Sequence, residues 1–293
     1  MFIATLIAAG NLSGGDISAA RDRLDQAGCL PAAHVWIDEG FAADIDFGLN
    51  PEAARAALEG VFPGVDVVVQ SDFWREKRVL VADMDSTMIT VECIDELADY
   101  AGIKAEIAAV TEAAMRGELD FEAALDARVA LLKGLDEKMI ERCLAERVTI
   151  TPGAVTLVHH MRARGATTIL VSGGFTRFAE PIAKRIGFER VIANRLQISD
   201  GKLDGTVAKP IVGSNTKEQA LLDAIASRAL PAAAALAVGD GANDLAMIRR
   251  AGLGIAYHAK PIVAAAAHAR VDHNDLTALL YAQGIARGEW LRG

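Results

Sequence analysis

The fold is organised around the segment Arg78-Val-Leu-Val-Ala-Asp-Met-Asp-Ser-Thr-Met-Ile-Thr-Val-Glu92. In this segment an apolar run ends abruptly in two carboxylates. The run from Val79 to Ala82 is short, apolar at successive positions and partly β-branched, which predicts a strand buried on both faces of a parallel sheet. Side chains two apart on a strand leave the same face, so we expect Asp83 and Asp85 to project together from its carboxyl end. In open α/β sheets, that edge is where ligands bind.

Two later apolar segments end in polar residues in the same way. Ala166 to Val171 is followed by Ser172-Gly-Gly-Phe175, and Ala234 to Val238 is followed by Gly239-Asp-Gly-Ala-Asn-Asp244. Between them a predicted helix, capped by Ser214 or Asn215 and running to about Ala229, carries Lys217 near its start. These patterns predict that the polar side chains meet at one edge of the sheet.

The segment from about 89 to 149 contains no strand signal and predicts an inserted helical cap. Each of its helices shows helical spacing and a stop such as Gly102 or Gly134. The predicted cap helices are Val91 to Tyr100, Ile103 to Met115, Phe121 to Lys133 and Asp136 to Ala145.

The α/β alternation then returns. Thr151-Pro152 predicts a helix start with proline at the first position, and Asp200-Gly201 predicts a hairpin within Leu196 to Val207. Leu253 to Tyr257 and Arg270 to Asp272 are candidate strands.

Residues 1 to 72 form a separate unit in this interpretation. The pattern is β-α-β-β-α-β, the ferredoxin-like split arrangement, and it resembles the small amino-acid-sensing ACT domains. A structural or dimerising appendage is the alternative. Because every motif residue lies beyond Asp72, we expect residues 73 to 293 to fold and act alone. The predicted elements are strand Phe2 to Ala8, helix Asp16 to Ala27, strand Ala33 to Ile37, strand Ala43 to Phe47, helix Pro51 to Leu58 and strand Val65 to Val69.

Composition narrows the class of protein. The 293 residues are 52% hydrophobic, enough for a sizeable core. The net charge of -9 argues against nucleic-acid or anionic-membrane partners, which require clustered Lys and Arg. The apolar opening has no Lys or Arg before Arg21, so we do not expect a signal peptide, and no other apolar run is long enough for a membrane span. Three unpaired cysteines favour a reduced, cytoplasmic protein.

With these residues assembled, the chain resembles a known family. Asp83-Met-Asp-Ser-Thr87, Ser172-Gly-Gly-Phe175, Lys217 and Gly239-Asp-Gly-Ala-Asn-Asp244 match the four motifs of the haloacid dehalogenase superfamily of phosphatases. Together with Glu92, Met115-Arg-Gly-Glu-Leu-Asp-Phe121 and Arg128, they resemble its phosphoserine phosphatase branch. The resemblance covers about Arg78 to the C-terminus. It implies a doubly wound α/β core with a helical cap, preceded here by the ferredoxin-like domain.

The resemblance also implies roles for these residues. Asp83 would be the nucleophile that forms an aspartyl-phosphate, and Asp85 the general acid and base. Mg²⁺ would be held by Asp83, Asp240 and the backbone carbonyl of Asp85, with Asp244 acting through a water. The phosphoryl oxygens would be bound by Lys217, the Ser172 hydroxyl and the Gly173 amide, and Asn243 would orient Lys217 or the substrate.

The cap helix predicts how the substrate is selected. Residues 121, 125, 128 and 132 share one face, so Arg128 interrupts a stripe of Phe121, Leu125 and Leu132. The arginine either lies at the edge of the stripe with its stem on apolar surface or grips a carboxylate. In the second reading Glu92 faces an ammonium, while Met115 and Phe121 exclude water.

The function expected from the resemblance is Mg²⁺-dependent hydrolysis of O-phospho-L-serine, the last step of serine biosynthesis. Phosphohomoserine or a sugar phosphate is the alternative substrate, and an amino-acid sensor with a vestigial phosphatase site is the alternative class. Regulation by L-serine and a homodimer are compatible with this arrangement.

Overall fold

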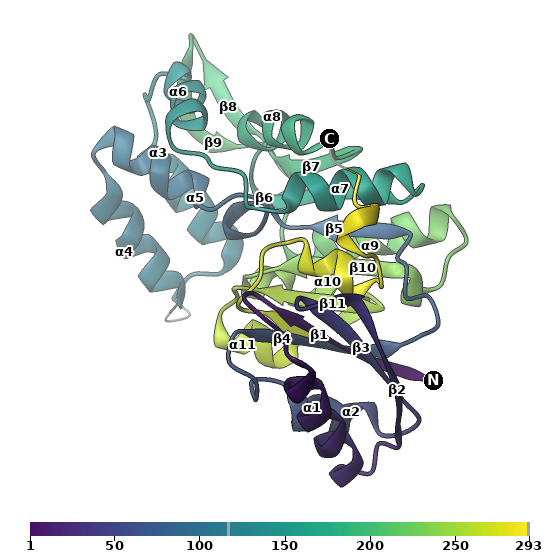
Figure 1. Ribbon diagram of the computed structural model, residues 1–293. Helices are drawn as coiled ribbons and strands as arrows, with labels where there is room; N and C mark the ends of the chain where they lie inside the picture. The colour runs from purple at the N-terminus through teal and green to yellow at the C-terminus, as the bar shows by residue number, and fades with distance from the viewer. Residues whose placement is uncertain (116–117, 292–293) are drawn as a thin grey trace.

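The structure is a computed structural model that describes residues 1–115 and 118–291. Two sheets organise this part of the chain, one of six strands and one of four, and a two-stranded hairpin stands apart from them. Figure 1 shows the four-stranded sheet with α1 and α2 at the bottom and the cap helices α3 to α6 at the upper left. The six-stranded sheet lies between these two parts.

The six-stranded sheet is parallel throughout and has the order β12-β11-β10-β5-β6-β7. From β5 the chain moves to one side through β6 and β7, then returns to the other side through β10. The strand order therefore reverses beside β5, which is where ligands bind in open α/β sheets. The strands are β5 (Val79–Ala82), β6 (Thr167–Phe175), β7 (Arg190–Asn194), β10 (Ala235–Gly239), β11 (Leu253–Tyr257) and β12 (Ala269–Val271).

Helices cover both faces of this sheet because its strands are apolar at successive positions. Leu80 and Leu170 pack under α7 (Ala154–Ala163), α8 (Thr176–Ile186) and α12 (Ala278–Ala282). On the opposite face, Val79 and Val81 pack under α9 (Ser214–Ser227), α10 (Leu245–Arg250) and α11 (Pro261–Ala266). The predicted doubly wound core is confirmed.

The cap consists of α3 (Cys93–Ala101), α4 (Lys104–Met115), α5 (Phe121–Leu131) and α6 (Lys138–Glu146). The predicted hairpin is also confirmed, as β8 (Leu196–Ser199) and β9 (Lys202–Val207). Two backbone hydrogen bonds join it to the cap. The Gly134 amide donates to the Leu203 carbonyl at 2.8 Å, and the Leu203 amide donates to the Leu135 carbonyl at 2.9 Å. Cap and hairpin therefore form one unit.

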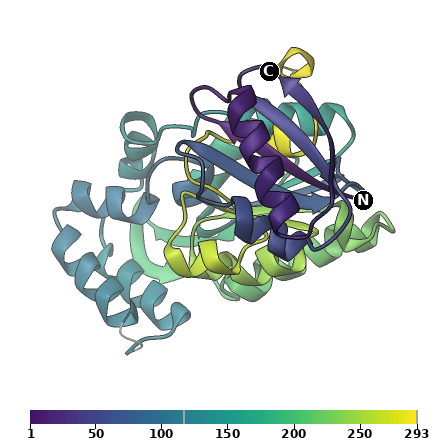
Figure 2. The same ribbon diagram turned by 60° about the horizontal axis from the view of Figure 1, so that its bottom comes forward.

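The N-terminal sheet has the order β2-β3-β1-β4, and the pairings are antiparallel. This is the ferredoxin-like arrangement that the sequence predicts. Helices α1 and α2 cover one face, where Ile17 and Leu58 share a core cluster with Leu6, and Figure 2 shows α1 lying across the sheet. The elements are β1 (Phe2–Ala8), α1 (Gly14–Gln26), β2 (Pro31–Asp38), β3 (Ala42–Phe47), α2 (Pro51–Leu58) and β4 (Val65–Ser71).

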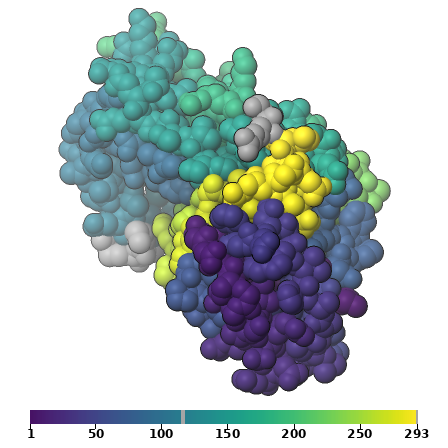
Figure 3. All heavy atoms as spheres, in the orientation of Figure 1, coloured from purple at the N-terminus to yellow at the C-terminus, as the bar shows by residue number. Residues whose placement is uncertain are grey.

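The other face of this sheet packs on the part of the chain that contains the six-stranded sheet. Ile7 and Val68 belong to the same apolar cluster as Leu279 and Tyr281 near α12. Figure 3 shows the yellow C-terminal segment lying along the boundary between the purple N-terminal part and the teal core. The two parts thus share a buried apolar layer.

Two predicted signals for a helix start were wrong, the proline of Thr151-Pro152 and the cap at Ser214 or Asn215. Helix α7 begins at Ala154, not at Pro152, because Gly153 has φ +83° and the Pro152 carbonyl accepts the Leu276 amide. A Cβ at Gly153 would lie only 2.6 Å from the backbone nitrogen of Thr277, so this turn before the helix requires glycine. Helix α9 is preceded by Gly213, and neither Ser214 nor Asn215 caps it. None of the helices in the described part has the length and apolarity of a membrane span.

Candidate active site

The two carboxylates that follow β5 lie in a tight turn. The strand ends at Ala82, and the turn Met84–Met88 contains Ser86 at φ +56°. Met84 is fully buried in the core, while Asp83 and Asp85 face the carboxyl edge of the sheet. The period-2 prediction therefore places both carboxylates correctly, although they lie just beyond the strand.

Lys217 joins this turn to the end of β10. Its Nζ donates to Asp83 Oδ1 at 2.5 Å and to Asp244 Oδ1 at 2.7 Å, and the side chain is fully buried. Burial lowers the pKa of Lys217, but the charges of Asp83 and Asp244 outweigh this and raise it, so the ammonium stays protonated. Burial and the negative charge of Asp244 raise the pKa of Asp83. Two buried carboxylates thus share one cation, and the site holds surplus negative charge.

This surplus fits a hard divalent cation. Ligand oxygens of Asp83, Asp240 and Asp244 all lie within 4.8 Å of one another. Burial, followed by the charge of Asp244, raises the pKa of Asp240 to about 6, and the Thr87 hydroxyl donates to its Oδ1 at 3.1 Å. Carboxylate oxygens are the ligands that Mg²⁺ prefers. The residues present are therefore suited to hold such an ion.

Asp85 has different partners. Its Oδ1 accepts the Cys93 amide at 2.8 Å, and its Oδ2 accepts the Ser172 hydroxyl at 3.1 Å. Burial raises the pKa of Asp85, and these hydrogen bonds oppose the rise. A carboxyl group with a raised pKa is suited to donate a proton at neutral pH. The side chain of Asp85 lies outside the acidic cluster, which leaves its backbone carbonyl for the role that the resemblance implies.

A cleft of about 630 Å³ opens above these residues, between the sheet edge and the cap. Ser172, Lys217 and Asp244 are fully buried beneath its lining. The predicted site residues that line the cleft are Asp83, Asp85, Glu92, Phe121, Arg128, Gly173, Asp240 and Asn243.

Two side chains of opposite charge reach the cleft from the cap side. Arg128 Nε donates to the Ala124 carbonyl at 3.2 Å on α5, and Glu92 accepts the Ser86 hydroxyl at 2.7 Å. The Glu92 side chain is exposed to the cleft. The surrounding protein still desolvates its carboxylate, and this desolvation together with the nearby charge of Asp85 raises the pKa of Glu92 to about 7. Burial lowers the pKa of Arg128, and the carboxylate of Asp95 is the strongest charge opposing that shift.

Phe121 closes over the loop Ser172-Gly173-Gly174 at the end of β6. A Cβ on Gly173 would lie 3.2 Å from its ring, and a Cβ on Gly213 would lie 3.5 Å from it. The ring therefore approaches the backbone closely because both positions are glycine. Leu125 and Leu132, the other apolar members of the predicted stripe, are buried in the core beside α5.

The described part of the chain does not establish the roles predicted for two site residues, Met115 and Asn243. The side chain of Met115 lies outside the described residues. Asn243 lines the cleft, but Lys217 is held by Asp83 and Asp244, and no hydrogen bond within the described part joins it to Asn243. The orientation of Lys217 by Asn243 therefore has no support here.

Sequence reasoning missed Asp95 and Lys260, which also line the cleft. Asp95 lies three residues after Glu92, the spacing that brings side chains together at a helix start. Lys260 follows the predicted strand Leu253 to Tyr257 by three residues, so its place at the sheet edge was readable from the same pattern as Asp240.

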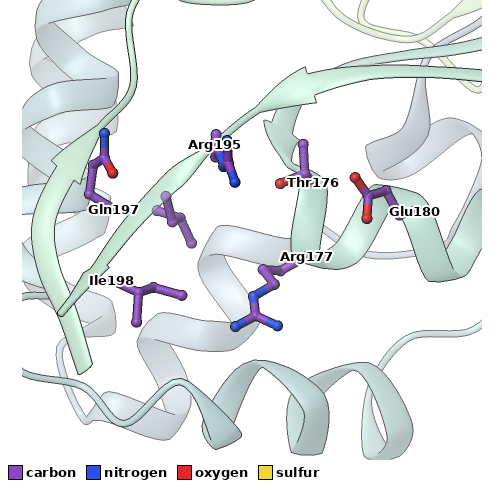
Figure 4. A pocket seen from close by; sticks show the side chains of 7 residues that line it. Thr176, Arg177, Glu180, Arg195, Gln197 and Ile198 are labelled. Atoms are coloured by element: carbon purple, nitrogen blue, oxygen red, sulfur yellow. The ribbon is translucent and has the colours of Figure 1, made fainter. Parts of the chain in front are cut away.

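A second cavity lies beside α8 and β8. It measures about 660 Å³ and is lined by Thr176, Arg177, Glu180, Arg195, Leu196, Gln197 and Ile198 (Figure 4). Its volume is similar to that of the cleft, but none of the acidic residues at the sheet edge lines it. Chemistry, not size, therefore identifies the cleft as the candidate active site.

The fold and the site together define a class of protein. Residues 80–249, more than half of the chain, match the family model of the haloacid dehalogenase-like hydrolases. The chain belongs to that family of enzymes, whose members generally use Mg²⁺.

Within the family, the chain is similar to phosphoserine phosphatases, as its motifs predict. The phosphoserine phosphatase of Streptomyces coelicolor is 44% identical over 246 residues, which cover 83% of this chain and 60% of the relative. The chain thus spans less than two thirds of the length of this curated relative.

Solved structures agree with this placement. A HAD family hydrolase from Salmonella enterica serovar Typhi superposes with a TM-score of 0.82 at 29% identity, covering 96% of this chain and 97% of that one. A phosphoserine phosphatase with an analogue of the phospho-aspartyl intermediate superposes with a TM-score of 0.65 at 37% identity, covering 70% and 98%.

Proposed function

We propose that this chain is a Mg²⁺-dependent phosphatase that hydrolyses O-phospho-L-serine to L-serine and phosphate, the last step of serine biosynthesis. The observation that carries the proposal is one cleft that combines a phosphoryl site with a cap-side pair of opposite charges. Asp83, Lys217 and Asp240 form the first, and Arg128 and Glu92 form the second. The names of similar proteins support the same substrate.

In the first half of the reaction, Asp83 attacks phosphorus. Lys217 holds Oδ1 of Asp83, and Oδ2 makes no hydrogen bond to the described residues, so Oδ2 is the free nucleophile. The new O–P bond gives an aspartyl-phosphate as the bond to the serine oxygen breaks. Protonated Asp85 donates its proton to that leaving oxygen.

In the second half, water hydrolyses the aspartyl-phosphate. Asp85, now ionised, takes a proton from the water, which attacks phosphorus and releases Asp83. The Ser172 hydroxyl, which donates to Asp85 in the free protein, is placed to turn to a phosphoryl oxygen beside the Gly173 amide.

A bound Mg²⁺ would supply positive charge to the phosphoryl oxygens and so reduce their repulsion of the attacking carboxylate. Asp83 and Asp240 would hold it with the Asp85 carbonyl, and Asp244 would act through a water. Asp244 suits the indirect position, because its two oxygens already accept the Lys217 ammonium and the Gly241 amide.

The cap-side pair distinguishes phosphoserine from other small esters. Arg128 would bind the carboxylate of the substrate and Glu92 its ammonium, while Phe121 and Met115 exclude water. A sugar phosphate offers neither charge, and phosphohomoserine places both one methylene further from phosphorus. The charge pair therefore supports a zwitterionic substrate such as phosphoserine over a sugar phosphate.

The test compares two substrates. Arg128→Ala leaves a buried charge of the substrate unpaired, which typically costs about 2 to 5 kcal/mol. At about 1.36 kcal/mol per tenfold, kcat/KM for phosphoserine falls roughly 30-fold to several-thousand-fold. Hydrolysis of p-nitrophenyl phosphate, which has no such charges, falls much less. Both activities require Mg²⁺ and disappear with chelator.

Equal losses on both substrates would reject the charge clamp, because Arg128 would then support the cap or the phosphoryl site. Absence of phosphate release from either substrate would instead favour a sensor with a vestigial site.

The remaining expectations are part of the same proposal. Residues 1–72 form a ferredoxin-like domain and residues 73–293 the catalytic domain. The N-terminal domain is proposed to bind L-serine as a regulator, and the protein to form a homodimer. Its three cysteines are free and buried, which supports a reduced, cytoplasmic location.

A further inference from the structure

Asn194 is a buried amide that ends β7 and lies next to the phosphoryl-binding loop without lining the cleft. Its Nδ2 donates to the Gly173 carbonyl at 2.8 Å and to the Val212 carbonyl at 3.3 Å. Its Oδ1 accepts the Val212 amide at 2.7 Å. One side chain therefore binds two backbone segments that are far apart in the sequence.

The first segment is the loop after Ser172. The parallel ladder between β6 and β7 shifts register there, since Ser172 pairs with Ala193 but Phe175 pairs with Asn194. Two glycines thus lie outside the regular pairing, and the Gly173 carbonyl is bound by a side chain instead of a strand. Asn194 thus holds the carbonyl of Gly173, the residue whose amide is proposed to bind phosphate.

The second segment leads into α9. Val212 precedes Gly213, whose carbonyl accepts the Lys217 amide at 3.1 Å in the first turn of the helix. Lys217 in turn holds Asp83. The hydrogen bonds of Asn194 to Val212 thus locate the start of the helix that carries the buried ammonium.

An amide is suited to this position because it offers donors and an acceptor on one planar group. An aspartate would keep the acceptor for the Val212 amide but place an oxygen against the carbonyls of Gly173 and Val212. The substitution replaces the NH2 group by an oxygen with almost no change in volume, so it removes the donor and adds a negative charge that the control variant must match.

We propose that Asn194 is a positioning residue for the phosphoryl site, which fixes the Gly173 loop relative to the Lys217 helix. The inference rests on the proposed phosphatase reaction but not on phosphoserine as the substrate. A residue that sets the phosphoryl site affects every phosphate ester alike, in contrast to Arg128.

The test uses the full-length chain with Mg²⁺. For Asn194→Asp, kcat/KM falls by about tenfold or more, and by the same factor for phosphoserine and p-nitrophenyl phosphate. The inhibition constant of inorganic phosphate rises with it. Gln283→Glu is the matched control, since Gln283 is equally buried, accepts the Lys77 amide and donates to the Leu279 carbonyl away from the cleft. It lowers the melting temperature but leaves both kcat/KM values within about twofold.

If Asn194→Asp does not fold, Asn194→Ser, which is neutral and smaller, replaces it in the same comparison. The proposal is overturned if the variant binds phosphate and turns over p-nitrophenyl phosphate as well as Gln283→Glu does, because Asn194 would then be merely structural. Loss on phosphoserine alone also overturns it. A wild-type chain that hydrolyses p-nitrophenyl phosphate but not phosphoserine would reject the proposed substrate and leave this comparison valid.

Discussion

Asp83 and Asp85 are two residues apart, but their hydrogen-bond partners suit them to different tasks. Asp83 contacts a cation, Lys217, which keeps one of its oxygens oriented. Asp85 contacts neutral donors, the Cys93 amide and the Ser172 hydroxyl. Burial raises the pKa of both carboxyl groups, so it is their partners that distinguish them. A carboxylate held by a cation is suited to attack, and one among neutral groups is suited to carry a proton.

Asp83→Asn is expected to abolish turnover without unfolding the protein. Turnover is lost because the amide is a poor nucleophile. The melting temperature stays close to wild type because Asp244 still binds the Lys217 ammonium and the site loses one of its surplus negative charges. Single-turnover assays with phosphoserine and thermal melts measure the two effects.

Asp85→Asn serves as the companion variant, which loses turnover but still binds inorganic phosphate and Mg²⁺. If Asp83→Asn kept substantial activity while Asp240→Asn lost all of it, water and not Asp83 would be the nucleophile.

The pKa of Glu92 predicts a pH dependence that is specific for phosphoserine. Desolvation by the surrounding protein and the charge of Asp85 raise this pKa to about 7. Glu92 therefore becomes neutral as the pH falls below 7 and loses its attraction for an ammonium. Because kcat/KM reports the free enzyme, the ratio of kcat/KM for phosphoserine to that for p-nitrophenyl phosphate falls between pH 8 and pH 6. Taking the ratio cancels the titration of enzyme groups that both reactions use, such as Asp85.

Glu92→Gln supplies the control for this profile. It lowers the ratio at pH 8 and makes it independent of pH across the same range. A wild-type ratio that stays constant from pH 8 to pH 6 would contradict the assignment of Glu92 to the ammonium.

At the scale of elements, helix α5 depends on the β8–β9 hairpin for its position. A Cβ on Gly205 in β9 would lie 3.0 Å from Lys133 Cβ and 3.4 Å from the Ala130 carbonyl oxygen, so α5 and the hairpin touch through a glycine. Helix α5 also carries Phe121 and Arg128 into the cleft. The hairpin thus helps to place the side chains that are proposed to select the substrate, although none of its residues lines the cleft.

Gly205→Ala is expected to displace α5 and raise KM for phosphoserine several-fold. Its φ of +87° adds a backbone cost of about 1 to 2 kcal/mol for a residue with a Cβ. Gly134→Ala is the matched control, because Gly134 has φ +85° and its Cβ would meet nothing within 4 Å. Thermal melts and steady-state kinetics separate the two effects.

Both glycine variants should therefore lose stability through the backbone, while Gly205→Ala alone changes KM. Equal KM values for the two variants would show that the contact between hairpin and α5 does not position the cap.

At the scale of the whole molecule, polar contacts tie the N-terminal sheet to the core in addition to the shared apolar layer. The buried carboxylate of Asp66 accepts the backbone amides of Asp272, His273 and Asn274, and the Asn274 side chain at 2.8 Å. Arg75 binds Asp44 at 2.7 Å and also donates to the Ala282 carbonyl.

These contacts reverse the expectation that residues 73–293 act alone. Without residues 1–72, the apolar surface around Leu279 and Tyr281 and the amides that Asp66 binds would face water. We expect the truncated chain to aggregate or to melt well below the full-length protein, although every site residue is present. Soluble yield, light scattering and thermal melts measure this.

A truncated chain that is monodisperse, melts within a few degrees of the full-length protein and keeps its kcat would contradict this expectation. The N-terminal domain would then be an appendage whose removal could only abolish regulation.

Features that depend on neighbours along the chain can be predicted from the sequence. Alternation and apolar runs predict the strands and the sheet edge at which Asp83, Asp85, Ser172 and Asp240 meet, since each comes within three residues of the end of an apolar run. The β-α-β-β-α-β order likewise predicts the ferredoxin-like sheet, and the Asp-Gly turn predicts the hairpin.

Tertiary structure alone decided which partners those residues meet. Three examples depend on contacts between residues far apart in the sequence. Lys217 lies between Asp83 and Asp244, Asn194 binds the Gly173 loop, and the N-terminal sheet covers α12. Such contacts are made through single side chains, which leave no periodic signal. Local pattern therefore shows where a polar group emerges from the sheet, and only packing shows what it binds.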